Sequence, residues 1–471
     1  MSENAKIGFV SLGCSKNQVD SEVMLGVLTG AGFELTREEA QADVLIVNTC
    51  GFIDKAKQES VDTIIELGEY KKTGRCRVLI ATGCLTERYR EELLKELPEL
   101  DAIVGTGDFP KIADLCRLLL GRSHGSSLMP VQWTGSPTFL YGPETPRLRI
   151  GARHWAYVKV SEGCHRTCSF CIIPGIRGGL QSRPADSIVG EVEHLAGEGV
   201  VEVNLIAQDM SGYGMDWGRR GELIHLLKRL VKISGIRWIR LLYLYPHRFP
   251  DGLMELMASE EKICKYVDLP LQHIDDDILR RMNRGGNSHE IRTLLDKLQK
   301  NIPGLILRTT FIVGFPGETE KQHQRLYNFV REIQFDRVGV FTYSPEEGTA
   351  AYPLGDTVSE AVKQRRRNRL LELQAKISMK KNSALIGTVH TVLVDGLSSE
   401  TDLLLEGRTA GHAPEIDGKI YINEGTAKPG DFVQIEITQA SHYDLVGRIV
   451  TSSQSQSGNL SHPAHPLLHP A

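Results

Sequence analysis

Three short apolar segments near the start of the chain are each followed by a cysteine. Lys6–Leu12, Asp43–Asn48 and Arg77–Thr82 read as buried strands, a short fourth follows at Ala102–Val104, and helical patterns separate them. This alternation of strands and helices predicts a parallel, doubly wound α/β sheet. In such a sheet right-handed crossovers place the carboxyl ends of all strands at one edge. Ligands of such sheets bind at that edge. The segment therefore predicts an open sheet with a cysteine-lined edge.

The three cysteines are Cys14, Cys50 and Cys84, and they lie 36 and 34 residues apart, about one strand and one helix each. Thiolates bind soft metals, and three ligands on a four-coordinate ion leave one position open. The alternative is three separate core cysteines, which chance would have to place at equivalent points. Small apolar filler is the favoured interpretation for the three cysteines without such placement, Cys76, Cys116 and Cys264.

A second group of three cysteines lies in the middle of the chain. Cys164, Cys168 and Cys171 have the spacing C-x-x-x-C-x-x-C, with no fourth cysteine nearby. An Fe–S cluster normally takes four thiolates, so a cubane held here would keep one iron open. A structural zinc site would need a fourth ligand, and His165 is too close in sequence to supply it easily. Three reduced cysteines in a loop are the alternative interpretation.

The pattern of elements divides the chain. Residues 1–135 form the predicted N-terminal sheet domain, and a proline- and glycine-rich linker follows. Residues 150–380 contain six strand–helix units, which predict an open (β/α)6 barrel with its active face at the strand carboxyl ends. Residues 383–451 alternate in short strands and predict a small antiparallel β-barrel. Residues 452–471 are rich in Ser, Gln, His and Pro and are predicted to be disordered.

Polar residues gather where the barrel strands are expected to end. They are Gln208, Asp209, His247, Gln272, His273 and the segment from Gly314 to Glu318. Each one singly could be a capping or turn residue, but their repetition on one face favours a ligand site.

The motifs resemble those of one enzyme family. The spacing of Cys164, Cys168 and Cys171 is similar to the signature of radical S-adenosylmethionine (SAM) enzymes. Residues 12–22 (Leu-Gly-Cys-Ser-Lys-Asn-Gln-Val-Asp-Ser-Glu) and 48–54 (Asn-Thr-Cys-Gly-Phe-Ile-Asp) resemble the methylthiotransferases within it, in the form that modifies a ribosomal-protein aspartate. Pro174 to Gly178 matches the Pro-x-x-Arg-Gly of that family, whereas Ser15 stands where proline is common. The C-terminal barrel resembles the TRAM module, which is OB-like.

The resemblance implies two [4Fe-4S] clusters, one on each cysteine triad, and two SAM equivalents. The cluster at Cys164, Cys168 and Cys171 would cleave SAM, and the other would present the sulfur. The implied SAM contacts are Phe170, Gln208, Arg308, Gly314 and Glu318, and ion pairing elsewhere is the alternative for Arg308. The implied substrate is an aspartate β-carbon of small-subunit ribosomal protein S-twelve, and the implied electron donor is reduced flavodoxin or ferredoxin.

The charge pattern bears on the partner. The predicted helix Lys363–Lys381 is strongly basic; a solvated face is the usual explanation, and contact with ribosomal RNA is the alternative. Residues 383–451 carry ten acidic and four basic side chains, a net charge of −6, which repels phosphate and attracts a basic protein. The net charge of the whole chain, −4, gives no basic footprint for nucleic acid. No membrane span is expected, because no run of 18 or more apolar residues appears. The protein is also expected to be cytoplasmic and monomeric.

Three rival functions remain open from the sequence. The first is methylthiolation of a tRNA adenosine with the same clusters, which the acidic barrel and the form of the Cys14 motif disfavour. The second is a non-catalytic Fe–S or zinc protein such as an electron carrier, which SAM binding would exclude. The third is an RNA- or ribosome-binding module without chemistry, for which the cysteines would be dispensable.

Overall fold

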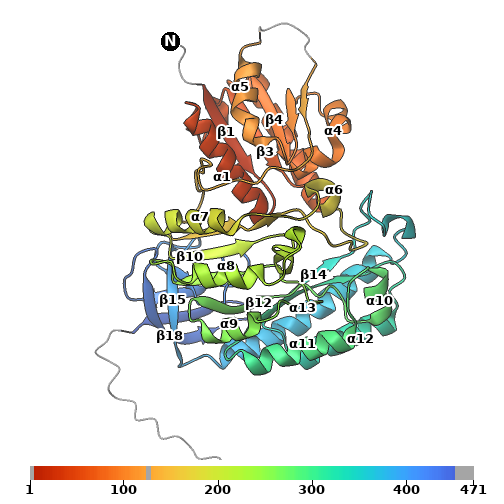
Figure 1. Ribbon diagram of the computed structural model, residues 1–471, viewed down its shortest axis with the longest axis vertical. Helices are drawn as coiled ribbons and strands as arrows, with labels where there is room; N and C mark the ends of the chain where they lie inside the picture. Colours follow the sequence, from red (N-terminus) through yellow and green to blue (C-terminus); the bar gives the residue numbers. More distant parts are fainter. Residues whose placement is uncertain (1–4, 123–128, 451–471) are drawn as a thin grey trace, which may run out of the picture. The chain divides into compact units, whose positions relative to one another are not determined.

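The computed structural model describes residues 5–122 and 129–450, and the chain divides into two compact units, Met1–Ile377 and Ser378–Ala471. The first unit contains two six-stranded sheets and the second a closed five-stranded barrel (Figure 1). The predicted disordered tail, residues 452–471, lies outside the described residues. No helix in the described ranges is long and apolar enough to cross a membrane.

The N-terminal sheet is parallel throughout, with strand order β2-β1-β3-β4-β5-β6. Its strands are β1 (Lys6–Ser11), β2 (Glu34–Thr36), β3 (Val44–Thr49), β4 (Val78–Gly83), β5 (Ala102–Val104) and β6 (Val131–Trp133). The predictions of β1, β3, β4 and β5 are confirmed. The two edge strands, β2 and β6, were not predicted, because their three residues do not form a continuous apolar run, whereas the equally short β5 (Ala-Ile-Val) does.

Helices cover both faces of this sheet. They are α1 (Ser15–Gly30), α2 (Asp54–Gly68), α3 (Tyr70–Thr73), α4 (Cys84–Glu96) and α5 (Ile112–Leu120). Apolar residues of α2 and α4, such as Ile64 and Leu85, pack on alternate residues of β3 and β4, such as Leu45 and Leu79. The helices α1 and α5 contact each other and pack on the other face. The sheet is therefore doubly wound, as predicted.

The second sheet has six parallel strands in chain order, β7-β10-β11-β12-β13-β14, which is the open barrel that the sequence predicts. The strands are β7 (Trp155–Lys159), β10 (Glu202–Ile206), β11 (Trp238–Leu241), β12 (Ile263–Asp268), β13 (Ile306–Val313) and β14 (Arg337–Thr342). The helices are α6 (Ile173–Arg177), α7 (Ala185–Gly197), α8 (Glu222–Leu230), α9 (Leu253–Ser259), α10 (Asp276–Arg281), α11 (Ser288–Asn301), α12 (Glu320–Ile333) and α13 (Glu360–Ser383). A short antiparallel pair, β8 (Ser161–Glu162) and β9 (Gln181–Ser182), brackets the cysteine loop.

The second unit closes in the order β15-β16-β17-β19-β18. Its strands are β15 (Val389–Leu397), β16 (Leu405–Arg408), β17 (Ile420–Glu424), β18 (Phe432–Ala440) and β19 (Leu445–Ile449). The neighbours are antiparallel except β17 and β19, which pair in parallel. Alternate apolar residues, among them Val392, Ile420 and Ile435, fill the interior. This is the small OB-like barrel that the sequence predicts.

The turn after β13 is fixed by a buried carboxylate. Glu318 accepts hydrogen bonds from the Gly314 N–H and Arg366, and its Oε1 lies 3.3 Å from Nε2 of His273. Burial acts to raise the pKa of Glu318, but these partners outweigh it and lower that pKa. Gly314 has a φ of +77°, and a side chain there would collide with Lys363 of α13. The turn is therefore held by protein groups on several sides.

His323 lies beside this turn, and both of its ring nitrogens are buried without a hydrogen-bond partner. Burial lowers the pKa of His323 to about 4, and Arg366 acts in the same direction against the opposing charge of Glu318. Unfolding would return this pKa to its usual value near 6.5. The unfolded chain therefore binds the proton more readily as the pH falls from 6.5 towards 4, so stability is lost across that window.

We expect the free energy of unfolding to fall by an amount on the order of 2 kcal/mol more in the wild-type protein than in His323→Gln between pH 6.5 and pH 4. Urea unfolding of the metal-free protein across this range would measure it. The exposed His225 provides the control, because His225→Gln should keep the wild-type pH dependence. Equal pH dependence in the wild type and His323→Gln would contradict the assignment.

Candidate functional site

The first triad, Cys164, Cys168 and Cys171, lies in one loop between β8 and α6, and its thiols form no disulfide. The backbone N–H of Cys164 donates to the carbonyl oxygen of Gly178 at 3.1 Å. Gly163 has a φ of +69°, and a side chain on it would collide with the carbonyl oxygens of Gly178 and Gly179. Only glycine therefore lets the start of the loop pack against the segment that follows α6.

The other side of this loop is anchored to the residues after α10. The N–H of Ser169 donates to the carbonyl oxygen of Met282 at 2.9 Å, and the Ser169 hydroxyl donates to the carbonyl oxygen of Arg281 at 2.8 Å. Arg284 donates from Nη1 to Sγ of Cys168 at 3.4 Å. A cation thus lies directly on one sulfur of the first triad.

The second triad comes together at the carboxyl edge of the N-terminal sheet. Cys14 precedes α1, Cys50 follows β3, and Cys84 opens α4. A side-chain carbon on Gly13 would lie 3.0 Å from Cβ and 3.4 Å from Sγ of Cys50, and one on Gly51 would lie 2.8 Å from the carbonyl carbon of Cys84. The three loops are therefore in contact, which is the convergence expected from their strand-end positions.

The donor sets fit iron–sulfur clusters. Burial raises the pKa of Cys84 and of Cys171 to about 12 and that of Cys164 to about 11, and the thiols of each triad repel one another as anions. A metal cluster offsets both costs, because it binds the deprotonated sulfurs. No three His, Cys, Asp or Glu side chains in the described ranges converge on a single metal ion. In a cubane each thiolate binds a different iron, so such convergence is not required.

A buried ionic network connects the two sheets. Arg177 of α6 donates from Nη1 to Asp20 of α1 at 2.9 Å and to Glu162 of β8 at 3.2 Å. Lys159 of β7 donates to the same two carboxylates, at 2.5 Å to Asp20 and 2.6 Å to Glu162. Burial acts to raise the pKa of Glu162, but Lys159 and Arg177 outweigh it and lower that pKa to about 2. Two cations and two anions therefore balance here.

The same arginine reaches the second triad. Its Nη2 donates to Oδ1 of Asn17 at 2.5 Å and to Sγ of Cys84 at 3.4 Å. Asn17 in turn donates to the carbonyl oxygen of Thr49, the residue before Cys50, at 2.8 Å. Arg177 thus joins the barrel to the loops that carry the second triad. In each triad an arginine side chain donates to one cysteine sulfur, Arg284 to Cys168 and Arg177 to Cys84.

The five predicted SAM contacts lie in different surroundings. Phe170 packs against an apolar cluster made of Ile278, Met282, Phe315, Tyr343 and Ala351. Gln208 donates to Glu162 at 2.6 Å, while its Oε1 is buried without a hydrogen-bond partner. Arg308 forms an ion pair with Asp268 at 2.7 Å, which is the alternative raised from the sequence. The carboxylate of Glu318 accepts a hydrogen bond from the backbone N–H of Gly314, as described above.

Several residues at the site were missed by the sequence analysis. Arg284 and Lys159 carry no pattern of their own, since each acts through a partner far away in the chain. Asp20 belongs to the motif of residues 12–22, but the motif does not indicate its ion pairs. Arg177 was noted only as part of a motif, and that motif was the one signal that could have drawn attention to it.

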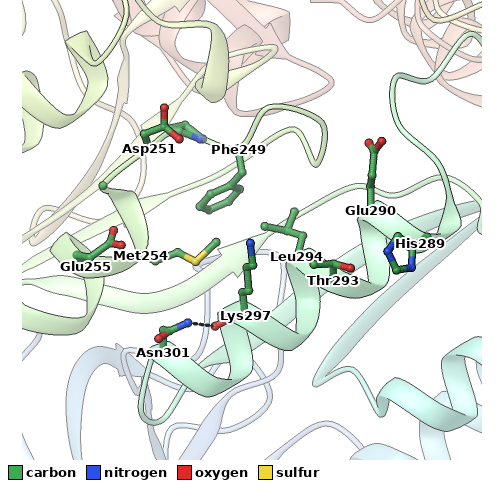
Figure 2. A pocket seen from close by; sticks show the side chains of 12 residues that line it. Phe249, Asp251, Met254, Glu255, His289, Glu290, Thr293, Leu294, Lys297 and Asn301 are labelled. Atoms are coloured by element: carbon green, nitrogen blue, oxygen red, sulfur yellow. Dashed lines mark hydrogen bonds between the residues drawn. The ribbon is translucent and has the colours of Figure 1, made fainter.

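A separate groove of about 530 Å³ lies between α9 and α11 (Figure 2). Phe249, Met254 and Leu294 form its apolar part, and Glu255 and Lys297 bring charges of both signs to its rim. Neither triad lines this groove, so it is not part of the candidate site.

Comparison with known proteins gives three matching regions. Residues 6–105 match the Uncharacterized protein family UPF0004, residues 158–330 the Radical SAM superfamily, and residues 386–450 the TRAM domain. The ribosomal protein uS12 methylthiotransferase RimO of Geotalea uraniireducens is 50% identical over 445 residues, which are 94% of this chain and 98% of that protein. The protein of the same name from Syntrophotalea carbinolica is 52% identical over 451 residues, 96% of this chain and 98% of its own length.

Among solved structures, the radical S-adenosylmethionine methyltransferase TsrM from Kitasatospora setae, with cobalamin and a [4Fe-4S] cluster bound, is similar with a TM-score of 0.54. The match covers 74% of each chain at 14% identity. At this identity the likeness shows the fold alone.

We expect Arg177→Met to lower the free energy of unfolding by about 3–5 kcal/mol, because two buried carboxylates would keep only Lys159 as a cation. Urea unfolding at neutral pH would measure this loss. The exposed Arg219 is the matched control, and Arg219→Met should stay within about 0.5 kcal/mol of the wild type. Equal effects of the two changes would show that the network does not stabilise the fold.

Proposed function

The chain belongs to the family of ribosomal protein uS12 methylthiotransferases, which are radical SAM enzymes, and we propose that it adds a methylthio group to the β-carbon of an aspartate in ribosomal protein uS12. The observation that carries the proposal is the pair of cysteine triads, one in the barrel and one at the edge of the N-terminal sheet. One triad alone would suit radical chemistry, whereas two suit the transfer of a sulfur group as well.

In this proposal each triad holds one [4Fe-4S] cluster. Cys164, Cys168 and Cys171 hold the first, and Cys14, Cys50 and Cys84 hold the second. When bound, the first cluster supplies the electron that cleaves SAM and the second supplies the sulfur. Arg284 and Arg177 each donate to one cysteine sulfur, and so stabilise the thiolate form of that ligand.

SAM lies, in this proposal, among Phe170, Gln208, Arg308 and the turn from Gly314 to Glu318. Phe170 offers an apolar ring for the nucleoside, and the unpartnered Oε1 of Gln208 offers an acceptor. Arg308 and Glu318 are already bonded to protein groups, so they shape the pocket and do not supply a free charge. The sequence suggested that Arg308 and Glu318 contact SAM directly, whereas this proposal gives them only a role in shaping its surroundings.

The proposed binding partners rest on the charge of the C-terminal barrel and on the similarity to uS12 methylthiotransferases. The net charge of −6 on residues 383–451 favours a basic ribosomal protein over RNA. In α13, Lys363 and Arg366 are buried and ion-paired, which leaves exposed residues such as Arg365 for any contact with ribosomal RNA. Reduced flavodoxin or ferredoxin supplies the electron, and the enzyme acts as a monomer in the cytoplasm, where its substrate is made.

The proposal is tested with anaerobically reconstituted protein given SAM, dithionite and sulfide. Separate reactions contain ribosomal protein uS12 or an isopentenylated tRNA, and mass spectrometry follows each. A methylthio mass gain on an aspartate of the protein is the expected result. A gain on the tRNA alone would overturn the choice of substrate, and no deoxyadenosine in any reaction would overturn the radical mechanism.

The two triads should fail differently when a cysteine is replaced. We expect Cys168→Ala to abolish deoxyadenosine formation, and Cys84→Ala to abolish methylthiolation while deoxyadenosine still forms, because only the first triad lies in the SAM-cleaving barrel. Each variant should lose half of the iron, from about eight to about four atoms per chain.

The buried Cys264 provides the control, because Cys264→Ala should keep the iron content and both activities. If Cys84→Ala retained full iron and full product, the second triad would not hold a cluster.

A further inference from the structure

Lys16 is a basic residue next to the second triad with an unusual position. It lies two residues after Cys14, in the first turn of α1, and is 6% exposed. Its ammonium nitrogen lies 3.1 Å from the ring centroid of Tyr243, which follows β11 in the barrel. A lysine of the N-terminal domain therefore reaches the carboxyl edge of the barrel sheet, where barrel enzymes bind their substrates.

Tyr243 is held in place for this contact. Its φ is +64°, a left-handed value that is strained for a bulky residue. Its N–H donates to Oδ2 of Asp268 at 2.9 Å, and its carbonyl oxygen accepts from Met210 at 3.0 Å. Such strain persists where the surroundings fix it and is common at ligand sites.

The neighbouring Tyr245 leads to the first triad. The guanidinium carbon of Arg284 lies 4.1 Å from the ring centroid of Tyr245, and Arg284 donates to Cys168. Tyr243, which contacts Lys16, is therefore only two residues from Tyr245, which contacts the arginine bonded to Cys168. Lys16 follows Cys14 of the second triad by two residues, and it is connected to the first triad through the segment of Tyr243 and Tyr245 and through Arg284.

Lys16 differs from the other cations at the site in its partners, since even Arg284, which has no carboxylate partner among the described residues, donates to Cys168 and to the carbonyl oxygen of Pro270. Lys159 and Arg177 share two carboxylates, Arg166 pairs with Asp209 at 2.7 Å, and Arg308 pairs with Asp268. Within residues 5–122 and 129–450, the side chain of Lys16 forms neither an ion pair nor a hydrogen bond, and its ammonium lies over the face of the Tyr243 ring. A nearly buried ammonium in this state favours an anionic ligand.

We propose that Lys16 binds the carboxylate of the target aspartate, an inference that rests on the proposed function. An ammonium has three N–H donors, so it can bond to a carboxylate while it stays over the ring. The β-carbon of an aspartate is bonded directly to its carboxyl carbon, so this charge-assisted bond would also fix the reacting carbon. The positive charge of Lys16 would also favour a target with an acidic side chain over one with a neutral amide or a basic side chain.

The test compares binding of two targets to the full-length protein with both clusters reconstituted and SAM present but no reductant. The targets are uS12 and its variant with asparagine in place of the modified aspartate. We expect Lys16→Met to raise the Kd of the aspartate target about 10- to 100-fold and to change the weaker Kd of the asparagine target less than about threefold. Lys16→Arg should restore much of the binding, because it keeps the charge.

Lys55→Met, at an exposed lysine of the same domain, is the matched control and should bind both targets as the wild type does. An equal loss for both targets would overturn the proposal, as would unchanged binding of the aspartate target. SAM also carries a carboxylate, so its Kd is measured in parallel, and a selective rise there would assign Lys16 to SAM instead. Loss of iron from Lys16→Met with unchanged target binding would assign it to the second triad.

Failure of the proposed function is distinguished by the wild-type protein. If the wild type modified tRNA and not uS12, the substrate itself would be wrong. If it modified uS12 and the Lys16 variants bound normally, only the role of Lys16 would fall.

Discussion

The relation between the two triads depends on one buried guanidinium. Arg177 belongs to the barrel, yet it bonds to Asp20 and Asn17 of α1 and to the sulfur of Cys84. A buried charge is tolerated only where partners with good geometry surround it, so this side chain favours a single arrangement of the two sheets. An apolar contact of the same size could slide, whereas four matched charges cannot do so without leaving one unpaired.

This arrangement places the chemistry at the meeting edges of two parallel sheets. The carboxyl ends of β1, β3 and β4 carry the second triad, and the carboxyl ends of the barrel strands carry Gln208 and Tyr243. Each sheet alone is an ordinary ligand-binding scaffold. In this structure the two edges contact each other, because Lys16 lies over Tyr243 and Arg177 donates to Asp20 and Cys84.

The sequence predicts much of this architecture because strand ends and cysteine spacing are local patterns. The loops of Cys14, Cys50 and Cys84 were expected to converge from the parallel topology alone, and they do. Long-range ion pairs have no such signature: Asp20 and Lys159 are 139 residues apart. For the same reason Arg308 and Glu318 looked available for a ligand in the sequence, although the fold pairs them with protein groups.

A count of charges along a chain therefore says little about which of them are available. In α13 the basic run is partly internal, because Lys363 pairs with Asp356 and Arg366 with Glu318. Lys16, by contrast, is a single lysine within the motif of residues 12–22, and the fold buries its side chain without an acidic partner in the described part of the chain. The lack of any polar partner at Lys16 within the described ranges is informative because Lys159, Arg177 and Arg284 nearby all form hydrogen bonds or ion pairs. An anion from outside the chain would complete the charge of Lys16, and the proposal above assigns this role to the target aspartate.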